Sequence, residues 1–384
     1  NHRELHPCPP RRPVAREAQV GKRGRQGGTG GGKQGGEQHP GRLPEESLNR
    51  LDSWLEEGRA GTMQWLEEGR PAMGALTDWK PWARSSLLFT ASYSRPGGGF
   101  RGGGKVARYA LGRDYHNHLG RRLQKLGRRL REDGELGRFR AVVDAAPVLE
   151  REWALEGGVG FRGKNTLVLD PARGPWQLLA ELIVDRDWPR WTPTPPAASC
   201  GSCTSCLDSC PTDAFTGPWS LDPRRCISYL TIECRGVIPR GLRPLMSDWV
   251  FGCDRCLEVC PFGTGGEDAS ETWGILPALG RWSLEDLLQV SEPDFDQAFE
   301  GSPIRRAGWA GLLRNACVAL GNLGRGAEAL LGATNHPEWL VRGHAAWALG
   351  RLGIRAPLAA LLDREPDPRV LEEIRASLDQ KGKS

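Results

Sequence analysis

The sequence predicts a chain of mixed α and β structure: an α/β or α+β domain, a small cysteine-rich module and a helical C-terminal domain. Three observations predict this fold class. Strand-like and helix-like segments alternate up to a Pro-rich stretch at residues 187–199. Seven of the eleven cysteines fall in two short runs, at residues 200–210 and 253–260. An Ala- and Leu-rich segment recurs near the end. We expect these parts: an extension over 1–43, domains over 44–190 and 276–384, and a module over 191–275.

The first 43 residues are rich in Gly and basic side chains. They hold nine Lys/Arg and three Asp/Glu, a balance of +6, whereas the whole chain carries +5. Ten of the twenty-one residues from 21 to 41 are Gly, so this segment cannot bury a core and we expect it to be disordered. It is either an extension without a folded role or a nucleic-acid-binding arm, and composition alone favours the first.

The domain over residues 44–190 contains four predicted strands after an initial helix. The helix begins near Glu45 and carries Leu48, Leu51 and Leu55 on one face. β-branched and aromatic content predicts the strands, although the last one is also compatible with a helix. Their ranges are Ser85–Tyr93, Phe139–Pro147, Asn165–Asp170 and Leu178–Asp185. We expect a mainly buried sheet covered by helices.

A basic region lies inside this domain. Residues 101–140 hold twelve Lys/Arg against four Asp/Glu. Within them, Arg121–Asp133 places leucines at helical spacing and basic residues on the other face. A solvated helix face explains this pattern as well as a polyanionic partner such as nucleic acid does.

The cysteine segments have the spacing of an iron–sulfur protein. The run CGSCTSCLDSCP, from Cys200 to Pro211, is C-x2-C-x2-C-x3-C-P, in which three thiolates hold one [4Fe–4S] cluster and the fourth crosses to another. The second run, CDRCLEVCP, adds only three cysteines, so two clusters lack one thiolate. Either Cys226 or Cys234 supplies it on spacing alone.

Cross-ligation predicts how the thiolates divide between the clusters. One set is Cys200, Cys203, Cys206 and Cys260; the other is Cys210, Cys253, Cys256 and one intervening cysteine. A zinc site usually shows two CxxC pairs, and a disulfide framework belongs to short secreted chains, so both alternatives fit less well. The module is therefore expected to be ferredoxin-like.

The C-terminal part contains a repeat. ACVALGNLG at Ala316–Gly324 recurs as AAWALGRLG at Ala345–Gly353, twenty-nine residues later. Both segments place Ala and Leu at helical spacing and end at Gly. A short HEAT-like repeat that docks a partner fits this period, and a capping bundle is the alternative.

Four further segments accompany the cysteines in a specific order. They are KVARYALGRDYH (Lys105–His116), VVDAAPVLERE (Val142–Glu152), GVGFRGKNTLVLD (Gly158–Asp170) and RCISYLTIE (Arg225–Glu233). With the cysteine spacing and the helical tail, they resemble the epoxyqueuosine reductase family from about residue 45 to 360. The chain departs from that family at residues 1–43, which supply no first strand, so we expect one edge of the sheet to be missing or made differently.

The resemblance implies a cobalamin-dependent iron–sulfur oxidoreductase of tRNA modification, which reduces epoxyqueuosine at the wobble position to queuosine. It implies base-off cobalamin in the first domain, two [4Fe–4S] clusters fed by an external low-potential donor, and a tail that helps hold the anticodon stem-loop. It also makes Cys226 the eighth ligand and leaves Cys234 unassigned. The residues it suggests at the cofactor are Arg108, Arg113, Asp144, Gly163, Lys164, Asn165, Thr166 and Ser228.

By the same resemblance Asp144 is the catalytic proton donor. It closes an apolar strand, the usual place for site residues in open α/β sheets, and an apolar pocket would favour its protonated form. Without the resemblance, a turn or helix-cap residue is the simpler interpretation. Nearby, Asp114 and His116 join Arg108 and Arg113 in a polar group, and we do not expect His116 to be a cobalt ligand.

Two other functions compete with this interpretation. A reductive dehalogenase also combines cobalamin with two clusters, but such enzymes resemble exported proteins, and no apolar stretch follows Arg11 and Arg12. A plain iron–sulfur electron carrier has no use for the Asp144 and Lys164 segments. No apolar run approaches the length of about 18 residues that a membrane span needs. We therefore expect a cytoplasmic protein without membrane contact, acting as a monomer.

Overall fold

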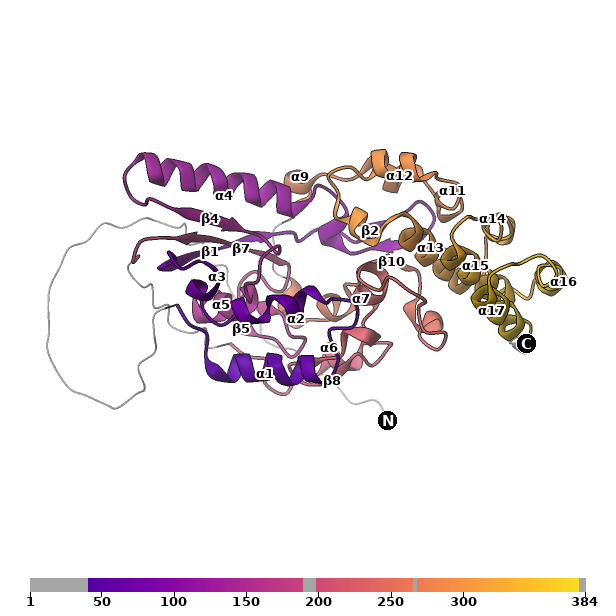
Figure 1. The fold of residues 1–384 in the computed structure, drawn as a ribbon, viewed down its shortest axis with the longest axis horizontal. Coiled ribbons are helices and arrows are strands. Elements are labelled where there is room, and N and C mark those ends of the chain that lie inside the picture. The colour runs from indigo at the N-terminus through magenta and orange to yellow at the C-terminus, as the bar shows by residue number, and fades with distance from the viewer. Residues whose placement is uncertain (1–40, 189–197, 265–267, 380–384) are drawn as a thin grey trace, which may run out of the picture. The chain divides into compact units, whose positions relative to one another are not determined.

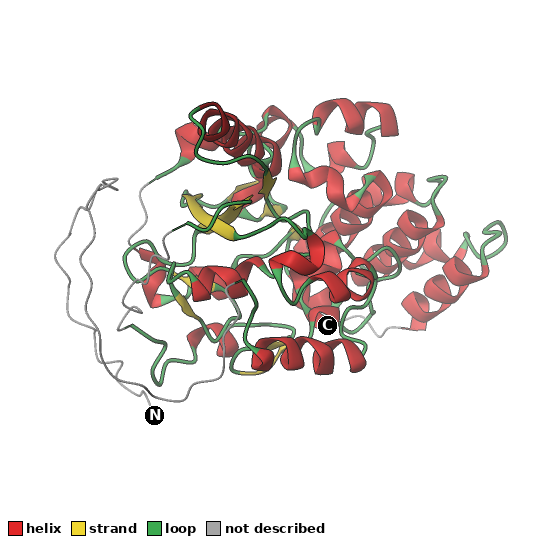
Figure 2. Cartoon of the chain, turned by 60° about the vertical axis from the view of Figure 1, so that its left-hand side comes forward, coloured by secondary structure: helices red, strands yellow, loops and turns green. Residues whose placement is uncertain are grey.

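The computed structural model describes residues 41–188, 198–264 and 268–379, all within one compact unit over residues 39–384 (Figures 1 and 2). Almost all of the predicted 1–43 extension lies outside the described residues, as does most of the predicted Pro-rich boundary. Those two predictions, and the division into domains, stay predictions. No helix among the described residues is long and apolar enough to cross a membrane.

The first part is organised around an antiparallel sheet with the strand order β1-β7-β4. β1 (Ser85–Ser92) pairs along its whole length with β7 (Gln177–Val184), and β4 (Phe139–Val142) pairs with the other edge of β7. The central strand is buried from Ala180 to Val184. Because successive strand residues face opposite sides, each side of β7 must be covered by other elements.

Helices cover both faces of this sheet (Figure 1). Leu182 and Val184 share one buried cluster with Leu119 and Leu123 of α4 (Tyr115–Glu132). Ile183 faces the other way and packs with residues of α3 (Leu76–Trp79) and α5 (Glu150–Glu156). The amphipathic pattern predicted α4, which begins six residues before Arg121 because Asp114 caps it by accepting the backbone N–H of His116.

The predicted strands are partly confirmed. The first and last correspond to β1 and β7, and the initial helix is α1 (Glu45–Glu56). The second strand ends at Val142 rather than Pro147, and the third is reduced to β6 (Val168–Leu169). Asp144 and Thr166 have φ values of 47° and 68°, which extended strands do not adopt.

The sheet also corrects one argument about Asp144. All three strands are antiparallel, so the sheet is of the α+β type and not an open parallel sheet. Asp144 follows β4, but the rule for the carboxyl ends of parallel strands does not apply to it.

The cysteine module is built from short helices and turns. α6 (Ser205–Asp208) and α8 (Arg255–Glu258) pack against each other and carry Cys206 and Cys256. α7 (Ile227–Ile232) begins directly after Cys226. The module's small strands are β8 (Phe215–Gly217), β9 (Ser220–Leu221) and β10 (Trp249–Phe251), the last of which pairs in parallel with β3 (Lys105–Val106) of the first part.

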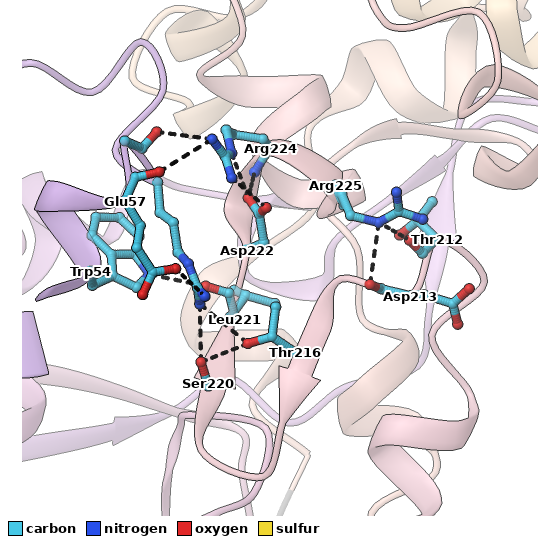
Figure 3. Close-up of polar contacts among 12 residues, drawn as sticks. Trp54, Glu57, Thr212, Asp213, Thr216, Ser220, Leu221, Asp222, Arg224 and Arg225 are labelled. Carbon is cyan, nitrogen blue, oxygen red and sulfur yellow. Dashed lines mark hydrogen bonds and ion pairs between the residues drawn. The ribbon is translucent and has the colours of Figure 1, made fainter.

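Polar contacts join α1 to the loop before Cys226 (Figure 3). The Trp54 indole N–H donates to the carbonyl of Leu221 at 2.9 Å. Arg224 donates to the carbonyls of Glu57 and Gly58 at 3.4 Å each, while it pairs with Asp222 in its own loop. The next residue, Arg225, donates to the carbonyl of Thr212 at 2.8 Å.

The remaining short elements connect these parts. In the first part they are α2 (Trp65–Gly69), η1 (Arg70–Ala72), β2 (Gly98–Gly99), η2 (Arg108–Ala110) and β5 (Phe161–Arg162), the last paired with β6. In the module and after it they are η3 (Pro223–Arg225), η4 (Arg243–Met246), η5 (Pro261–Thr264) and α9 (Ser270–Trp273).

The regular elements described after residue 276 are all helical. α13 (Trp309–Leu323), α15 (Trp339–Arg351) and α17 (Pro368–Asp379) pack in succession. A Cβ on Gly321 would come within 3.0 Å of the Ala348 backbone, so Gly lets these helices approach closely. The predicted paired helices are confirmed, and their HEAT-like character stays a prediction.

The remaining helices of the C-terminal part are shorter. They are α10 (Pro277–Arg281), α11 (Leu284–Leu287), α12 (Glu292–Ala298), η6 (Pro303–Ala307), α14 (Ala327–Ala333) and α16 (Arg355–Ala359).

Candidate active site

Four cysteines of the module line a single cavity. They are Cys200, Cys203, Cys206 and Cys260, the same four that cross-ligation assigns to one cluster. Lys164 and Asn165, from the loop between β5 and β6, close another side of this cavity. Burial, with contributions from the neighbouring Cys200, Cys260 and Cys203, raises the pKa of the Cys206 thiol to about 11.

The second predicted set of cysteines also gathers. Burial raises the pKa of the Cys256 thiol well above its ordinary value, and Cys226 and Cys253 add to the effect. Burial likewise raises the pKa of Cys253, to which Cys226 and Cys210 contribute. Burial raises the pKa of the Cys226 thiol. The backbone N–H groups of Tyr229 and Ser228 lower it, but burial has the larger effect. The structure therefore brings Cys226 together with Cys210, Cys253 and Cys256.

The remaining described cysteines take other contacts. The Cys234 thiol lies 3.8 Å from the carbonyl of Gly236 and donates to it. Cys317 is fully buried within α13. Across the described residues, no three His, Cys, Asp or Glu side chains are arranged to hold a metal ion. A cubane cluster holds its thiolates further apart than one tetrahedral ion does.

The cavity of the first set has the donors that a cluster needs. The backbone N–H of Lys164 donates to the Cys200 sulfur at 3.4 Å. Asn165 lines the cavity, and its side-chain nitrogen is buried without a hydrogen-bond partner among the described residues. Four thiols and an unused N–H donor match a thiolate-bound cluster whose sulfurs accept hydrogen bonds.

Asp144 stands where three elements meet. The Tyr115 hydroxyl donates to Asp144 Oδ2 at 2.5 Å, and the Nε2 atom of His116 lies 3.8 Å from the same oxygen. The Asp144 backbone N–H donates to Oε1 of Glu150, at the start of α5, at 2.6 Å. A non-Gly residue with positive φ is strained, and such strain is common at functional sites.

The electrostatics of Asp144 correct a prediction. Its side chain is 60% exposed. Desolvation by the surrounding protein raises the pKa of Asp144, but the contacts with His116 and Tyr115 outweigh it and lower the pKa overall. The expectation of a protonated Asp144 in an apolar pocket is therefore wrong, because the pocket supplies a cation and a hydroxyl donor.

His116 carries the proton that Asp144 lacks. Its Nδ1 lies 2.7 Å from Oδ1 of Asp114, so the imidazole stands between two aspartates. Desolvation lowers the pKa of His116, but the bonds to Asp114 and Asp144 raise it to about 9. The imidazolium is therefore the stable form at neutral pH. The sequence placed Asp114 and His116 in a polar group, but it did not indicate Tyr115 as a partner of Asp144.

Two further carboxyl groups lie near Asp144: Glu150 is half-buried and Glu181 is fully buried. Burial raises the pKa of Glu150 to about 7, and Asp144 adds to the shift. Burial raises the pKa of Glu181 to about 8, with a contribution from Glu150. Glu181 is fully buried on β7, accepts the Ser86 hydroxyl at 3.0 Å and leaves Oε1 without a partner among the described residues. The position of Glu181 depends on the sheet pairing, whereas Glu150 reaches Asp144 by a local contact at the start of α5. Sequence reasoning named neither of them.

Other predicted cofactor residues lie around these two centres. Arg108 stacks on Trp176 with its guanidinium carbon 4.1 Å from the ring centre, and Arg113 is exposed. The Thr166 carbonyl accepts from Arg151 at 3.4 Å, which ties the Lys164 loop to α5. Ser228 lies in the first turn of α7, beside Cys226. The contacts predicted between Gly163–Thr166 and cobalamin stay a prediction.

Two family models match separate parts of the chain. A 4Fe-4S double cluster binding domain matches residues 199–263, and the model described as epoxyqueuosine reductase QueG, DUF1730, matches residues 75–145. An epoxyqueuosine reductase from Xanthomonas campestris is 40% identical over 79% of this chain and 88% of its own length.

The chain belongs to the epoxyqueuosine reductase family. It is therefore an oxidoreductase whose module matches a domain for two [4Fe–4S] clusters.

Further relatives agree with this family. The epoxyqueuosine reductase of Pseudomonas aeruginosa is 48% identical over 65% of this chain and 70% of its own length. A crystal structure of selenomethionine-labelled epoxyqueuosine reductase matches with a TM-score of 0.79 and 27% identity, covering 89% of this chain and 93% of that one. An epoxyqueuosine reductase bound to an epoxyqueuosine-modified tRNA-Tyr stem loop matches with a TM-score of 0.76 and 26% identity, covering 88% and 92%.

Proposed function

We propose that this chain removes the epoxide oxygen of epoxyqueuosine at the wobble position of tRNA, using two [4Fe–4S] clusters and cobalamin. The substrate and the reaction are inferred from the family relationship. A solved relative holds an epoxyqueuosine-modified tRNA stem loop, which supports the same substrate here. The predicted location remains the cytoplasm, where thiolate clusters are compatible with a reducing environment.

The two cysteine sets support the ligand assignment. Cys200, Cys203, Cys206 and Cys260 share a cavity. Cys226 and Cys210 contribute to the raised pKa of Cys253, and Cys226 and Cys253 contribute to that of Cys256. Cys206 also contributes to the raised pKa of Cys256, so the two sets are close enough to interact. We assign one cluster to each set, fed by an external low-potential donor.

Cobalamin would contribute a redox-active cobalt centre, and residues around Asp144 are suited to hold it. Asp144 is open to solvent on one side, and Arg113 and Thr166 add polar groups within the same part of the fold. Amide and phosphate groups of a corrinoid need such partners. We propose Arg108, Arg113, Gly163–Thr166 and Ser228 as its surroundings, as the resemblance implies.

The chain must also deliver protons. Reduction of an epoxide to an alkene and water consumes two electrons and two protons. We propose that Asp144 passes a proton to the departing oxygen and that its contacts with Tyr115 and His116 orient it. The Bacillus subtilis neighbour, at 26% identity and a TM-score of 0.75, has a catalytic aspartate loop that swings out of the active site. That observation supports a loop aspartate such as Asp144 in this role.

The basic face of α4 and the helical tail are the proposed tRNA contacts. Six basic side chains of α4 are exposed, and phosphate contacts favour such a stripe. They are Arg121, Arg122, Lys125, Arg128, Arg129 and Arg131. We propose that the enzyme acts on the anticodon stem-loop as a monomer.

Anaerobic turnover tests this function. The reconstituted protein is incubated with cobalamin, a strong reductant and tRNA from cells that lack the last step of queuosine synthesis. Nucleoside analysis should show epoxyqueuosine converted to queuosine only when cobalamin is present. Reduction of an organohalide in place of the tRNA would favour a dehalogenase, and failure to bind any corrinoid would favour a plain electron carrier.

A further inference from the structure

We propose that Lys164 and Asn165 are the outer contacts of the cluster held by Cys200, Cys203, Cys206 and Cys260, and that they raise its reduction potential above that of the second cluster. This inference rests on the proposed assignment of the two clusters. It gives both residues a role in electron transfer in addition to the cobalamin contact that resemblance suggests. It also predicts the direction in which electrons move.

Lys164 is a buried cation fixed on the loop of the first cysteine set. Its side chain is 8% exposed, and Nζ donates to the carbonyls of Gly201 at 2.8 Å and Cys203 at 2.9 Å. Its backbone N–H donates to the Cys200 sulfur at 3.4 Å. A buried charge is screened much less than an exposed one, so this ammonium should act strongly on an electron that enters the cavity.

Asn165 adds a buried donor in the lining of the same cavity. Its side chain is 4% exposed and lines the cavity of the four thiols. Oδ1 accepts the backbone N–H of Leu167 at 3.3 Å, which leaves Nδ2 as the group without a partner among the described residues. A buried amide without a partner is costly, so a sulfur acceptor in the cavity explains its position.

The second cysteine set has cations of a different kind. Arg225 donates to the carbonyls of Thr212 and Asp213 at 2.8 and 3.3 Å, in the loop after Cys210, but its side chain is exposed (Figure 3). Arg108 lies 3.7 Å from the carboxylate of Glu258, which offsets its charge. Arg151, which acts to lower the pKa of Cys226, is exposed as well. Solvent screens Arg225 and Arg151, and Glu258 offsets the charge of Arg108, so none of the three should match the effect of Lys164.

This difference predicts a direction of electron flow. Hydrogen bonds to cluster sulfurs and nearby positive charge both favour the reduced cluster. Backbone N–H groups reach the second set as well, where Ala214 donates to the Cys210 sulfur at 3.4 Å, so the two sets differ in the buried charge of Lys164. That charge should make the Cys200 set take electrons from the Cys226 set.

Redox titration followed by electron paramagnetic resonance tests the proposal. Lys164→Gln removes the charge and keeps an N–H donor, Lys164→Arg keeps the charge, and Asn165→Leu removes the amide. Arg225→Gln is the matched control, because it removes an exposed cation from the other cysteine loop. Cys226→Ser replaces a proposed ligand of the second cluster, so the paramagnetic resonance signal that it alters can be assigned to that cluster. Iron per chain is measured for every variant.

The expected result is a lower midpoint potential for the first cluster in Lys164→Gln and Asn165→Leu, with the second cluster unchanged. In Lys164→Arg the midpoint potential of the first cluster should stay close to that of the unchanged protein. Arg225→Gln should not change the midpoint potential of the first cluster. Full iron content with unchanged potentials in both variants would overturn this inference and leave the proposed function intact. A wild-type chain that binds no clusters would instead overturn the proposed function.

Discussion

The Nε2 atom of His116 lies 3.8 Å from Oδ2 of Asp144, and Nδ1 of the same ring contacts Asp114. The two contacts raise the pKa of His116 to about 9 against the effect of desolvation, which lowers it. The site thus keeps a proton on the imidazole and a negative charge on Asp144 at neutral pH. If Asp144 delivers the proton as proposed, that proton is held on the neighbouring imidazole of His116.

Replacing His116 should change the pH dependence of turnover. In the unchanged enzyme the imidazolium is lost as pH rises through about 9, so kcat should fall there. His116→Asn should lower kcat by about 10²-fold, the lower end of general acid–base effects, and should remove that limb. His118→Asn is a control on the same helix. A variant that keeps the alkaline limb would show that another group titrates.

Asp144→Ala should keep both clusters and cobalamin but lose at least about 10²-fold in turnover, because the group that delivers the proton is gone. Asp144→Asn tests the same point with the side-chain shape retained. Iron content, corrinoid absorbance and single-turnover nucleoside analysis check the prediction. Normal turnover in either variant would show that Asp144 is not the donor.

Cysteine replacement should separate Cys226 from Cys234. Cys226→Ser should lose or convert one cluster and so lower the iron content, since its thiol belongs to the second set. Cys234→Ser is the matched control, because its thiol lies near the Gly236 carbonyl instead. Iron analysis after anaerobic reconstitution measures both. An iron loss in Cys234→Ser with full iron in Cys226→Ser would reverse the assignment.

Glu181→Gln should stabilise the protein in mildly alkaline solution. Burial raises the pKa of Glu181 to about 8, so the folded chain holds a proton that the unfolded chain releases above pH 4.5. Between those two values the unfolding free energy of the unchanged protein should fall by up to about 1.4 kcal/mol per pH unit from this group. Above pH 8 the loss levels off.

The variant should lack this part of the pH dependence, because an amide can still accept the Ser86 hydroxyl without binding a proton. Denaturant unfolding at pH 5 and pH 8 measures the difference. Glu68→Gln, at an exposed position, is the control and should change little. Parallel curves for Glu181→Gln and the unchanged protein would contradict the prediction.

Charge reversal on α4 should weaken tRNA binding. Arg121→Glu combined with Arg128→Glu removes two exposed cations of the helix, so the affinity should fall and its dependence on salt should become shallower. Arg281→Glu, an exposed cation on α10, is the control. Filter binding across a salt series measures both. Unchanged affinity and slope in the double variant would place the tRNA elsewhere.

Sequence patterns predicted features that depend on local spacing. The cysteine runs supplied seven members of the two sets that the structure gathers, and the resemblance supplied Cys226. The strands at Ser85 and Leu178 were predicted within one residue of their observed starts. The strands at Phe139 and Asn165 were predicted too long, because a residue with positive φ interrupts each apolar run. Hydrophobic pattern does not reveal such a backbone conformation.

Contacts between residues that lie far apart in the chain could not be predicted from the sequence. The ionised state of Asp144 depends on α4 delivering Tyr115 and His116 to the end of β4. The position of Lys164 against the Cys200 loop likewise depends on how the first part packs on the module. Strand pairing and helix packing create both arrangements, and neither leaves a signal in residue spacing.

Metal analysis of anaerobically prepared protein tests the central claim most directly. Two [4Fe–4S] clusters on the assigned thiolates predict about eight irons per chain and little zinc. Stoichiometric zinc, or iron far below that value after reconstitution, would contradict the account.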